Sequence, residues 1–249
     1  MTERKGKVYI STMIAPSFED DMETAFKHIE VGDIFFISRL VTRNPSALTQ
    51  TFCGRSLLHV ACESRDYSIV NFLVEFGTDV NTRTAAGQTP LHITARTNNV
   101  DILNLLLTVG ADISVLDELS YTALHVACEN GSSECASTLV SMMSDEELAY
   151  HTLTGFSPLH LASAAGLANI VQMLCDYHVP LIVRDNQGLT ALHHACKMGF
   201  IDVAMILIQN GHHIDYIDKQ SRRPFSYISN AKDLATLERQ YRYVCIHVN

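Results

Sequence analysis

The sequence predicts an all-α solenoid, a row of short helix pairs stacked side by side, and three observations support this fold class. A histidine recurs at steps of 33, 33, 35 and 33 residues, at His59, His92, His125, His160 and His193. Each of these histidines opens a stretch with the pattern of two short helices and a closing turn. Helices this short are unstable alone in water, so each pair has to be buried against its neighbours.

Residues 87–112 contain the most complete copy of this unit. Thr89 supplies a hydroxyl cap for the first helix, and Pro90 follows at a first-turn position, where its missing N–H costs nothing. Leucines crowd the second helix, and Gly110 ends it, because a residue without Cβ adopts the left-handed turn most cheaply. We therefore expect two helices, a tight turn between them and a closing loop in each copy.

The opening turns carry a resemblance to a known family. They closely resemble the ankyrin repeat signature at that family's 33-residue period, in the segments SLLHVA (56–61), TPLHIT (89–94), TALHVA (122–127), SPLHLA (157–162) and TALHHA (190–195). The resemblance covers roughly residues 20–240. It implies helix-turn-helix pairs joined by β-turn hairpins, about seven repeats including degenerate terminal caps, and a binding scaffold without catalytic function.

The domain organisation follows from this period. Residues 20–240 form one ankyrin repeat domain, with repeats that begin near residues 22, 55, 88, 121, 156, 189 and 222. Residues 1–19 form either a flexible N-terminal arm or a strand on the first repeat, and residues 241–249 form a C-terminal tail. In the N-terminal cap, we expect Gly32 to turn between two helices and the apolar residues after it to face the next repeat, namely Phe35, Phe36, Leu40 and Val41.

Two irregularities in the repeats lead to local predictions. Arg65 and Asn98 replace the glycine of the turn between helices, so a positive φ is costly for Arg65 and easier for Asn98. The fourth repeat is two residues longer, and Ser144 with Glu147 has the spacing of a capping box. We expect a short extra helical turn there.

Composition excludes several classes of function. A net charge of −9 and a pI near 5.7 argue against direct binding of nucleic acid. No apolar run approaches the length needed to cross a membrane, so we expect no membrane insertion. Of the seven cysteines, Cys62, Cys128 and Cys196 share one small helix position and are interpreted as buried packing residues without disulfides. Cysteines without disulfides favour a reducing compartment, so we expect a cytoplasmic protein, with the nucleus as a second location. We also expect a monomer.

The histidines do not predict a metal site. The five signature histidines lie one per repeat, about 10 Å apart if helices stack at normal spacing, too far to share one ion. Each is expected to bond backbone in the neighbouring turn, as in the family. His212 and His213 approach an exposed hairpin and also favour no metal. Motifs for phosphate binding, dinucleotide binding, zinc proteolysis and serine hydrolysis are absent, so we predict no enzyme, cofactor or catalytic residue.

The variable residues of the repeats are the candidates for contact with a partner. In ankyrin proteins the hairpin tips and the inner ends of the first helices face partners. By register, the tip candidates are Leu119, Tyr121, Leu153, Phe156 and Leu189, and the helix-end candidates are Glu129, Ala165, Lys197 and Met198. Large apolar side chains on exposed hairpins indicate a surface that a protein covers. The alternative is that Tyr121, Phe156 and Leu189 pack between neighbouring hairpins and stabilise the stack.

Two further expectations come from the resemblance. Asn81 resembles the hairpin asparagine that is hydroxylated in many ankyrin proteins, although an asparagine there also bonds its own turn. The resemblance implies one of two functional classes. The chain is an adaptor that holds a protein in its groove in intracellular signalling or regulation, or it is the regulatory or substrate-recruiting segment of a larger kinase or ubiquitin ligase. The identity of the partner is left open.

Overall fold

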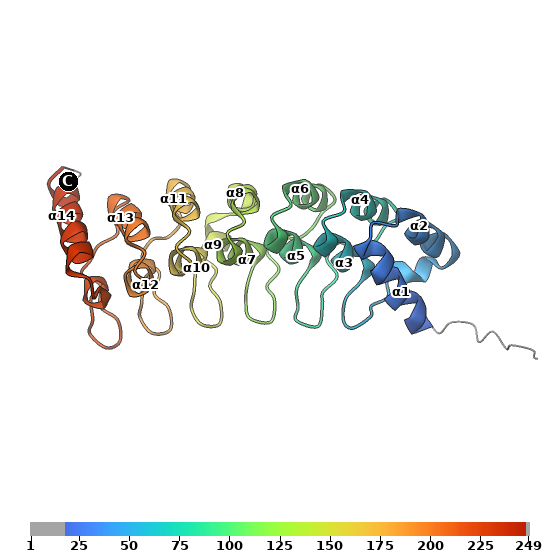
Figure 1. Ribbon diagram of the computed structural model, residues 1–249, viewed down its shortest axis with the longest axis horizontal. Coiled ribbons are helices and arrows are strands. Elements are labelled where there is room, and N and C mark those ends of the chain that lie inside the picture. The colour runs from blue at the N-terminus through green and yellow to red at the C-terminus, as the bar shows by residue number, and fades with distance from the viewer. Residues whose placement is uncertain (1–17, 248–249) are drawn as a thin grey trace, which may run out of the picture.

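The computed structural model of the protein describes residues 18–247 and confirms the all-α solenoid. The helices follow one another along a single elongated array (Figure 1). They are α1 (Phe18–Glu30), α2 (Ile34–Arg43), η1 (Pro45–Leu48), α3 (Leu57–Ser64), α4 (Tyr67–Glu75), α5 (Pro90–Thr97), α6 (Val100–Thr108), α7 (Ala123–Asn130), α8 (Ser133–Met142), α9 (Asp145–Leu148), α10 (Pro158–Ala164), α11 (Ala168–Asp176), α12 (Ala191–Met198), α13 (Ile201–Gln209), η2 (Pro224–Tyr227) and α14 (Ala231–His247).

The helices form two layers, with the hairpin loops projecting from one side (Figure 1). The inner layer contains α3, α5, α7, α10 and α12, and the outer layer contains α4, α6, α8, α11 and α13. Each helix packs against the next member of its own layer and against its partner in the other layer. One column of fully buried leucines in the outer helices shows the regular stacking: Leu73, Leu106, Leu139, Leu174 and Leu207. The core is therefore a continuous strip between the two layers.

The predicted caps and turns explain where the inner helices begin and end. Each regular inner helix opens with a serine or threonine whose backbone N–H donates to Nδ1 of the signature histidine three residues later, at 3.1–3.2 Å. Arg65 and Asn98 end their helices in the left-handed conformation, with φ of 62° and 53°. Both residues thus have the positive φ expected at this turn, and the cost of it for Arg65 stays a prediction.

The two extra residues of the fourth repeat form the predicted helical turn. In α9, the Ser144 hydroxyl accepts from the Glu147 N–H, and the Glu147 carboxylate accepts from the Ser144 N–H at 2.8 Å. This capping box is confirmed. The insertion lengthens the path from the outer helix α8 to the next hairpin.

The structure corrects two expectations at the ends of the array. Phe35 is 80% exposed, because the buried face of α2 is set by Ile37 and Val41 and a helix turns 100° per residue. Helix α14 continues to His247, so most of the expected tail, residues 241–249, is helical. The expected arm, residues 1–19, lies outside the described residues except where α1 begins at Phe18. Within the described chain, no helix has the length and apolar character needed to cross a membrane.

Candidate functional site

The hairpin tips form a hydrogen-bonded row along one edge of the array. At four successive tips a backbone N–H donates to a carbonyl of the preceding tip: Glu118 to Ala86, Leu153 to Leu119, Asn186 to Thr154, and Lys219 to Gln187, all at 3.0–3.1 Å. Adjacent tips are thus held at fixed spacing. A surface built across several tips is preorganised before any partner arrives.

Three aspartates that sequence reasoning missed shape the tips. The Oδ1 atoms of Asp117, Asp185 and Asp218 each accept two backbone N–H groups of their own hairpin, at 2.7–2.9 Å. The spacing from Asp185 to Asp218 is one repeat of 33 residues, and that period was the signal available in the sequence. Each carboxylate takes the place of a backbone acceptor inside a turn.

Two of the predicted tip residues form an exposed pair, which we call the tip leucine pair. Leu119 and Leu153 are 60% and 63% exposed, and the Leu153 N–H donates to the Leu119 carbonyl at 3.1 Å. Two leucines on adjacent, mutually bonded tips make a small apolar platform in solvent. Nothing in the described residues covers it.

A hollow of about 240 Å³ lies beside this pair and gathers three predicted residues. Its lining contains Leu119, Tyr121 and Glu129 together with Gln88, Arg96, Asp117, Val126 and Asn130. The Tyr121 hydroxyl donates to Glu129 at 3.4 Å, and burial, helped by the Glu129 charge, raises the pKa of Tyr121 to about 12. Tyr121 therefore remains a neutral hydrogen-bond donor with its ring forming one wall.

The N-terminal side of the hollow is charged. Arg96 lies 3.5 Å from Glu63, and Glu63 also pairs with Arg55 at 2.6 Å. These side chains are more than one third exposed, so the pairs add little stability and can exchange partners. The hollow thus has an apolar tip and a charged margin.

Leu189 was expected at an exposed tip, and the structure shows that this placement is wrong. Its side chain is only 2% exposed, and its carbonyl accepts from His160 of the preceding repeat at 3.1 Å. The position lies at the base of the hairpin, directly before Thr190, the cap of α12. Leu189 therefore has no surface to offer a partner.

Phe156 occupies the same base position and is half-buried. Its ring lies 4.8 Å from the ring of His194 and 5.8 Å from that of His160, measured between centroids. Phe156 thus packs against the next repeat, as the packing alternative described.

The remaining helix-end candidates lie apart from the hollow. Ala165, Lys197 and Met198 are exposed at the ends of α10 and α12, further along the groove, and none lines the hollow. Counting four residues from each signature histidine gives Glu63, Arg96, Glu129, Ala164 and Lys197. Ala165 therefore lies one residue outside the column that holds Glu129.

Four of the five signature histidines tie one repeat to the next. Because Nδ1 accepts the cap N–H, the proton lies on Nε2, which donates to a carbonyl of the following hairpin at 3.0–3.2 Å: His59 to Gln88, His92 to Tyr121, His160 to Leu189, and His193 to Arg222. Their expected bond to the neighbouring turn is confirmed. His125 is the exception: its buried Nε2 makes no hydrogen bond of good geometry with a described residue, although the backbone of Phe156 in the next hairpin lies near enough to offset part of the lowering of its pKa.

The other buried histidines also serve the structure. His194 Nε2 lies 2.9 Å from Asp185 Oδ2, and both residues are buried. His212 was expected to be exposed but is 1% exposed, and its ring lies 6.0 Å from that of Tyr216 between centroids. No group of three metal-ligating side chains is found within the described chain.

The three cysteines that share one helix position are buried, as expected. Burial raises the pKa of Cys62 and Cys196 to about 12 and also raises that of Cys128, so all three are the expected packing thiols.

Asn81 makes bonds that connect two repeats. Its side-chain amide donates to the Gly110 carbonyl at 3.1 Å, and its Oδ1 accepts from the Asp112 N–H at 2.8 Å. The side chain is half-buried, and the structural role of this asparagine is clear. Its hydroxylation stays a prediction.

The stacked helix pairs, open groove and bonded tips define a helical repeat protein. The family model described as ankyrin repeats (3 copies) matches overlapping stretches of the chain, at residues 25–117, 58–150, 105–181 and 144–219. These matches cover well over half of the sequence. The chain belongs to the ankyrin repeat family, whose fold is a protein–protein interaction module.

Several curated proteins are similar over part of the chain. The probable 26S proteasome regulatory subunit p28 of Saccharomyces cerevisiae is 31% identical over 108 residues, which cover 42% of this chain and 47% of that protein. Protein phosphatase 1 regulatory subunit 27 of Mus musculus is 36% identical over 85 residues, covering 34% of this chain and 55% of that protein. An ankyrin and IPT/TIG repeat-containing protein of Schizosaccharomyces pombe is 34% identical over 77 residues, 31% of this chain but only 7% of that protein. The chain thus spans about half or less of these relatives.

Solved structures share the fold over nearly the whole array. The ankyrin repeat domain of human ASB11 aligns with a TM-score of 0.77 at 20% identity, covering 86% of this chain and 96% of that one. The ankyrin repeat domain of Bcl-3 aligns with a TM-score of 0.73 at 21% identity, covering 86% and 97%. At this level of identity the likeness concerns the fold alone.

Proposed function

We propose that the chain is a non-enzymatic scaffold or adaptor that holds a protein partner across the tip leucine pair and the adjoining hollow. The observation that carries this proposal is the exposure of Leu119 and Leu153, at 60% and 63%, on tips that are bonded to each other. Tyr121 and Glu129 line the hollow beside them. An apolar centre with a polar rim is the usual composition of a protein interface.

The relatives support a role in regulation. Two of them are named as regulatory subunits, of the 26S proteasome and of protein phosphatase 1. Adaptors of this kind bring a partner to an enzyme without carrying out chemistry themselves. We extend the proposal to a monomeric protein of the cytoplasm, with the nucleus as a second location, because the described cysteines are free thiols.

A second candidate is supported by another relative. The probable E3 ubiquitin-protein ligase XBOS32 of Oryza sativa is 37% identical over 73 residues, which are 28% of this chain and 15% of that protein. Under this candidate the array is the regulatory or substrate-recruiting segment of a larger ubiquitin ligase or kinase whose catalytic part lies elsewhere. The reading frame that follows Asn249 in the transcript distinguishes the two candidates.

The test is a double substitution, Leu119→Asp with Leu153→Asp, in tagged protein purified from cells. Because both side chains are largely in solvent, we expect the melting temperature to change by no more than about 2 °C while a co-purifying partner is lost. The matched control is Val31→Asp, a residue 77% exposed in the first helix pair, which should keep the partner. Retention of the partner by the double variant would reject the proposed site.

A further inference from the structure

The outer layer carries a row of exposed apolar residues on the face opposite the hairpin groove. The row contains Phe76, Val109, Met142 and Tyr177, which are 50%, 42%, 57% and 43% exposed. Their spacing is 33, 33 and 35 residues, the same as that of the signature histidines. They therefore occupy one equivalent place, the C-terminal end of α4, α6, α8 and α11. We call this the outer apolar row.

The row is widened by residues one helical turn earlier. Phe72, Leu105 and Met173 precede row members by four residues and are half-buried, so they lie on the same faces. The Phe72 and Phe76 rings are 4.4 Å apart between centroids. The result is an apolar strip that crosses four helix pairs and is narrowest at α8, where Thr138 takes this earlier place. The equivalent residue of α13 is Asn210, where the strip ends.

The charges around the row have one sign. The five outer helices contain no lysine or arginine, and each carries one exposed carboxylate: Glu75, Asp101, Glu134, Asp176 and Asp202. None of these carboxylates forms an ion pair with a described residue. Where they have partners, these are neutral amides of Asn71, Asn98 and Gln172. The face is acidic and uncompensated.

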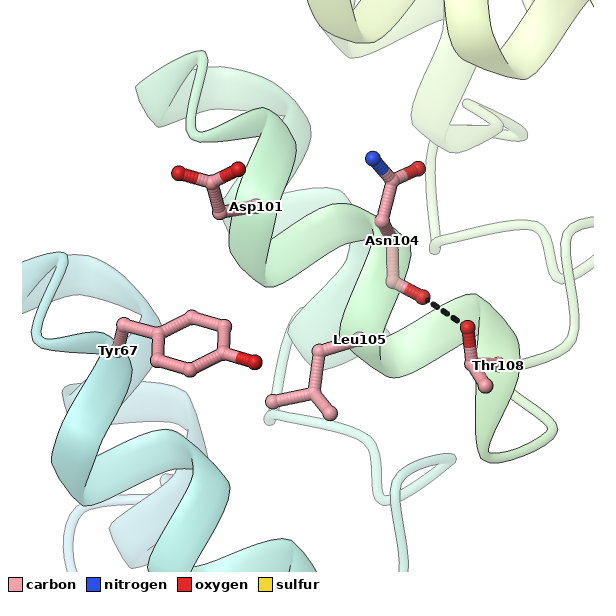
Figure 2. A pocket seen from close by; sticks show the side chains of 5 residues that line it. All are labelled: Tyr67, Asp101, Asn104, Leu105 and Thr108. Atoms are coloured by element: carbon pink, nitrogen blue, oxygen red, sulfur yellow. Dashed lines mark hydrogen bonds between the residues drawn. The ribbon is translucent and has the colours of Figure 1, made fainter.

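A recess of about 510 Å³ interrupts the strip between α4 and α6 (Figure 2). The Tyr67 side chain reaches across from α4, Leu105 lies between it and Thr108, and the Asp101 carboxylate stands at the edge. The Thr108 hydroxyl donates to the Asn104 carbonyl at 2.7 Å, so its proton is already engaged. Asp101 makes no hydrogen bond or ion pair with the described residues. The recess fits a long cationic side chain, with its stem on Leu105 and Tyr67 and its head at Asp101.

We propose that this outer face is a second docking surface and that it binds a basic amphipathic helix of a partner protein. The apolar row receives the apolar side of the helix, the carboxylates face its lysines and arginines, and the recess takes one of these side chains. Charge complementarity selects this occupant over an acidic or neutral segment. The surface is separate from the groove, so it stands independently of the function proposed there.

The spacing of the row favours a helix over an extended strand. Packed helices lie about 10 Å apart, and seven residues of an α-helix rise about 10.5 Å, so a heptad repeat brings one apolar side chain to each row residue. An extended chain covers the same distance in about three residues, which places successive contacts on opposite sides of the strand. A helix of about 22 residues spans the four row positions.

The experiment uses a synthetic helical peptide of about 22 residues, with leucines at heptad spacing and lysines elsewhere, and the full chain. Fluorescence anisotropy should detect binding that weakens about tenfold in the variant Phe76→Ser, Val109→Ser, Tyr177→Ser, and that also weakens as salt rises from about 0.05 to 0.5 M. The tip variant Leu119→Ser, Leu153→Ser should bind as the wild type does. A peptide in which glutamates replace the lysines should not bind.

A matched pair of single substitutions tests the recess without risk to folding. Asp101→Asn should weaken binding of the lysine peptide about threefold, whereas Asp202→Asn, on α13 beyond the end of the row, should leave it unchanged. Equal binding by the row variant, or equal binding of the glutamate peptide, would overturn the proposal. So would loss of binding in the tip variant alone, which places the peptide in the groove. A wild-type dimer in sedimentation that the row substitutions dissociate would assign the face to a second copy of the chain and also overturn it.

Discussion

Acidification is the perturbation for which the structure gives the clearest magnitude. Burial lowers the pKa of His125, His160 and His212 to about 4, from an ordinary value near 6.5. Below pH 6.5 the unfolded chain binds protons at these sites while the folded chain stays neutral, so stability falls as the pH falls from about 6.5 toward 4. For one such histidine the loss at pH 5 is about 2 kcal/mol, or about 6 kcal/mol for the three.

The geometry supports the same direction. In His125 and His160, Nδ1 accepts a backbone N–H of the helix cap, and a protonated ring cannot accept that bond. The loss is comparable with the whole stability of a typical domain and corresponds to a fall in melting temperature of about 10–20 °C.

The assay is thermal unfolding followed by far-UV circular dichroism at about pH 8 and about pH 5. Both pH values lie above the ordinary pKa of carboxylates, so the histidines dominate the change in this window. Replacing the exposed His178, which has a positive φ, by asparagine should leave the pH dependence as it is, while His160→Gln should reduce it. A melting temperature that stays constant or rises between pH 8 and pH 5 would refute the assignment of neutral, buried histidines.

Three further outcomes are expected. His160→Ala should destabilise the chain by about 1 kcal/mol more than His125→Ala in urea unfolding, because the Nε2 bond of His160 to the next repeat is well formed and that of His125 is not; equal costs contradict this role. Gly166→Ala should lower the melting temperature more than Gly199→Ala. Both glycines have positive φ, but only at Gly166 would an added Cβ meet an aromatic ring, that of Phe200, at 2.7 Å. Equal falls in melting temperature would contradict this packing. Mass spectrometry of protein from cells should show oxidation of the peptide that contains Asn81, and an unmodified peptide removes the prediction.

Local chemistry made much of the fold predictable. The histidine period placed the helix pairs, because a hydroxyl cap with a histidine three residues later fixes each helix start. The capping box of Ser144 and Glu147 and the left-handed Arg65 could likewise be predicted, since each depends on residues within one turn. The outer apolar row was also present in the spacing, although the period alone gives no sign that it is exposed.

Contacts between repeats decided the candidate site. Leu153, Phe156 and Leu189 are all large apolar residues of hairpins, yet one is 63% exposed, one half-buried and one 2% exposed. The difference depends on which flank the neighbouring repeat covers, and those contacts join residues about one repeat apart. Register separates Leu153 at a tip from Phe156 and Leu189 at the hairpin base, but residue type and register do not give how deeply a side chain at the base is buried.

The chain by itself determined the repeat, the caps, the turns and the acidic, apolar composition of its variable positions, because these follow from interactions over a few residues. Only the tertiary structure decided that Leu189 is buried at the base of its hairpin, that Phe35 faces away from the core and that His125, alone among the five signature histidines, has no well-formed Nε2 bond to the next repeat. These three outcomes depend on stacking geometry, which a two-residue insertion or a missing neighbour changes without altering any local signal.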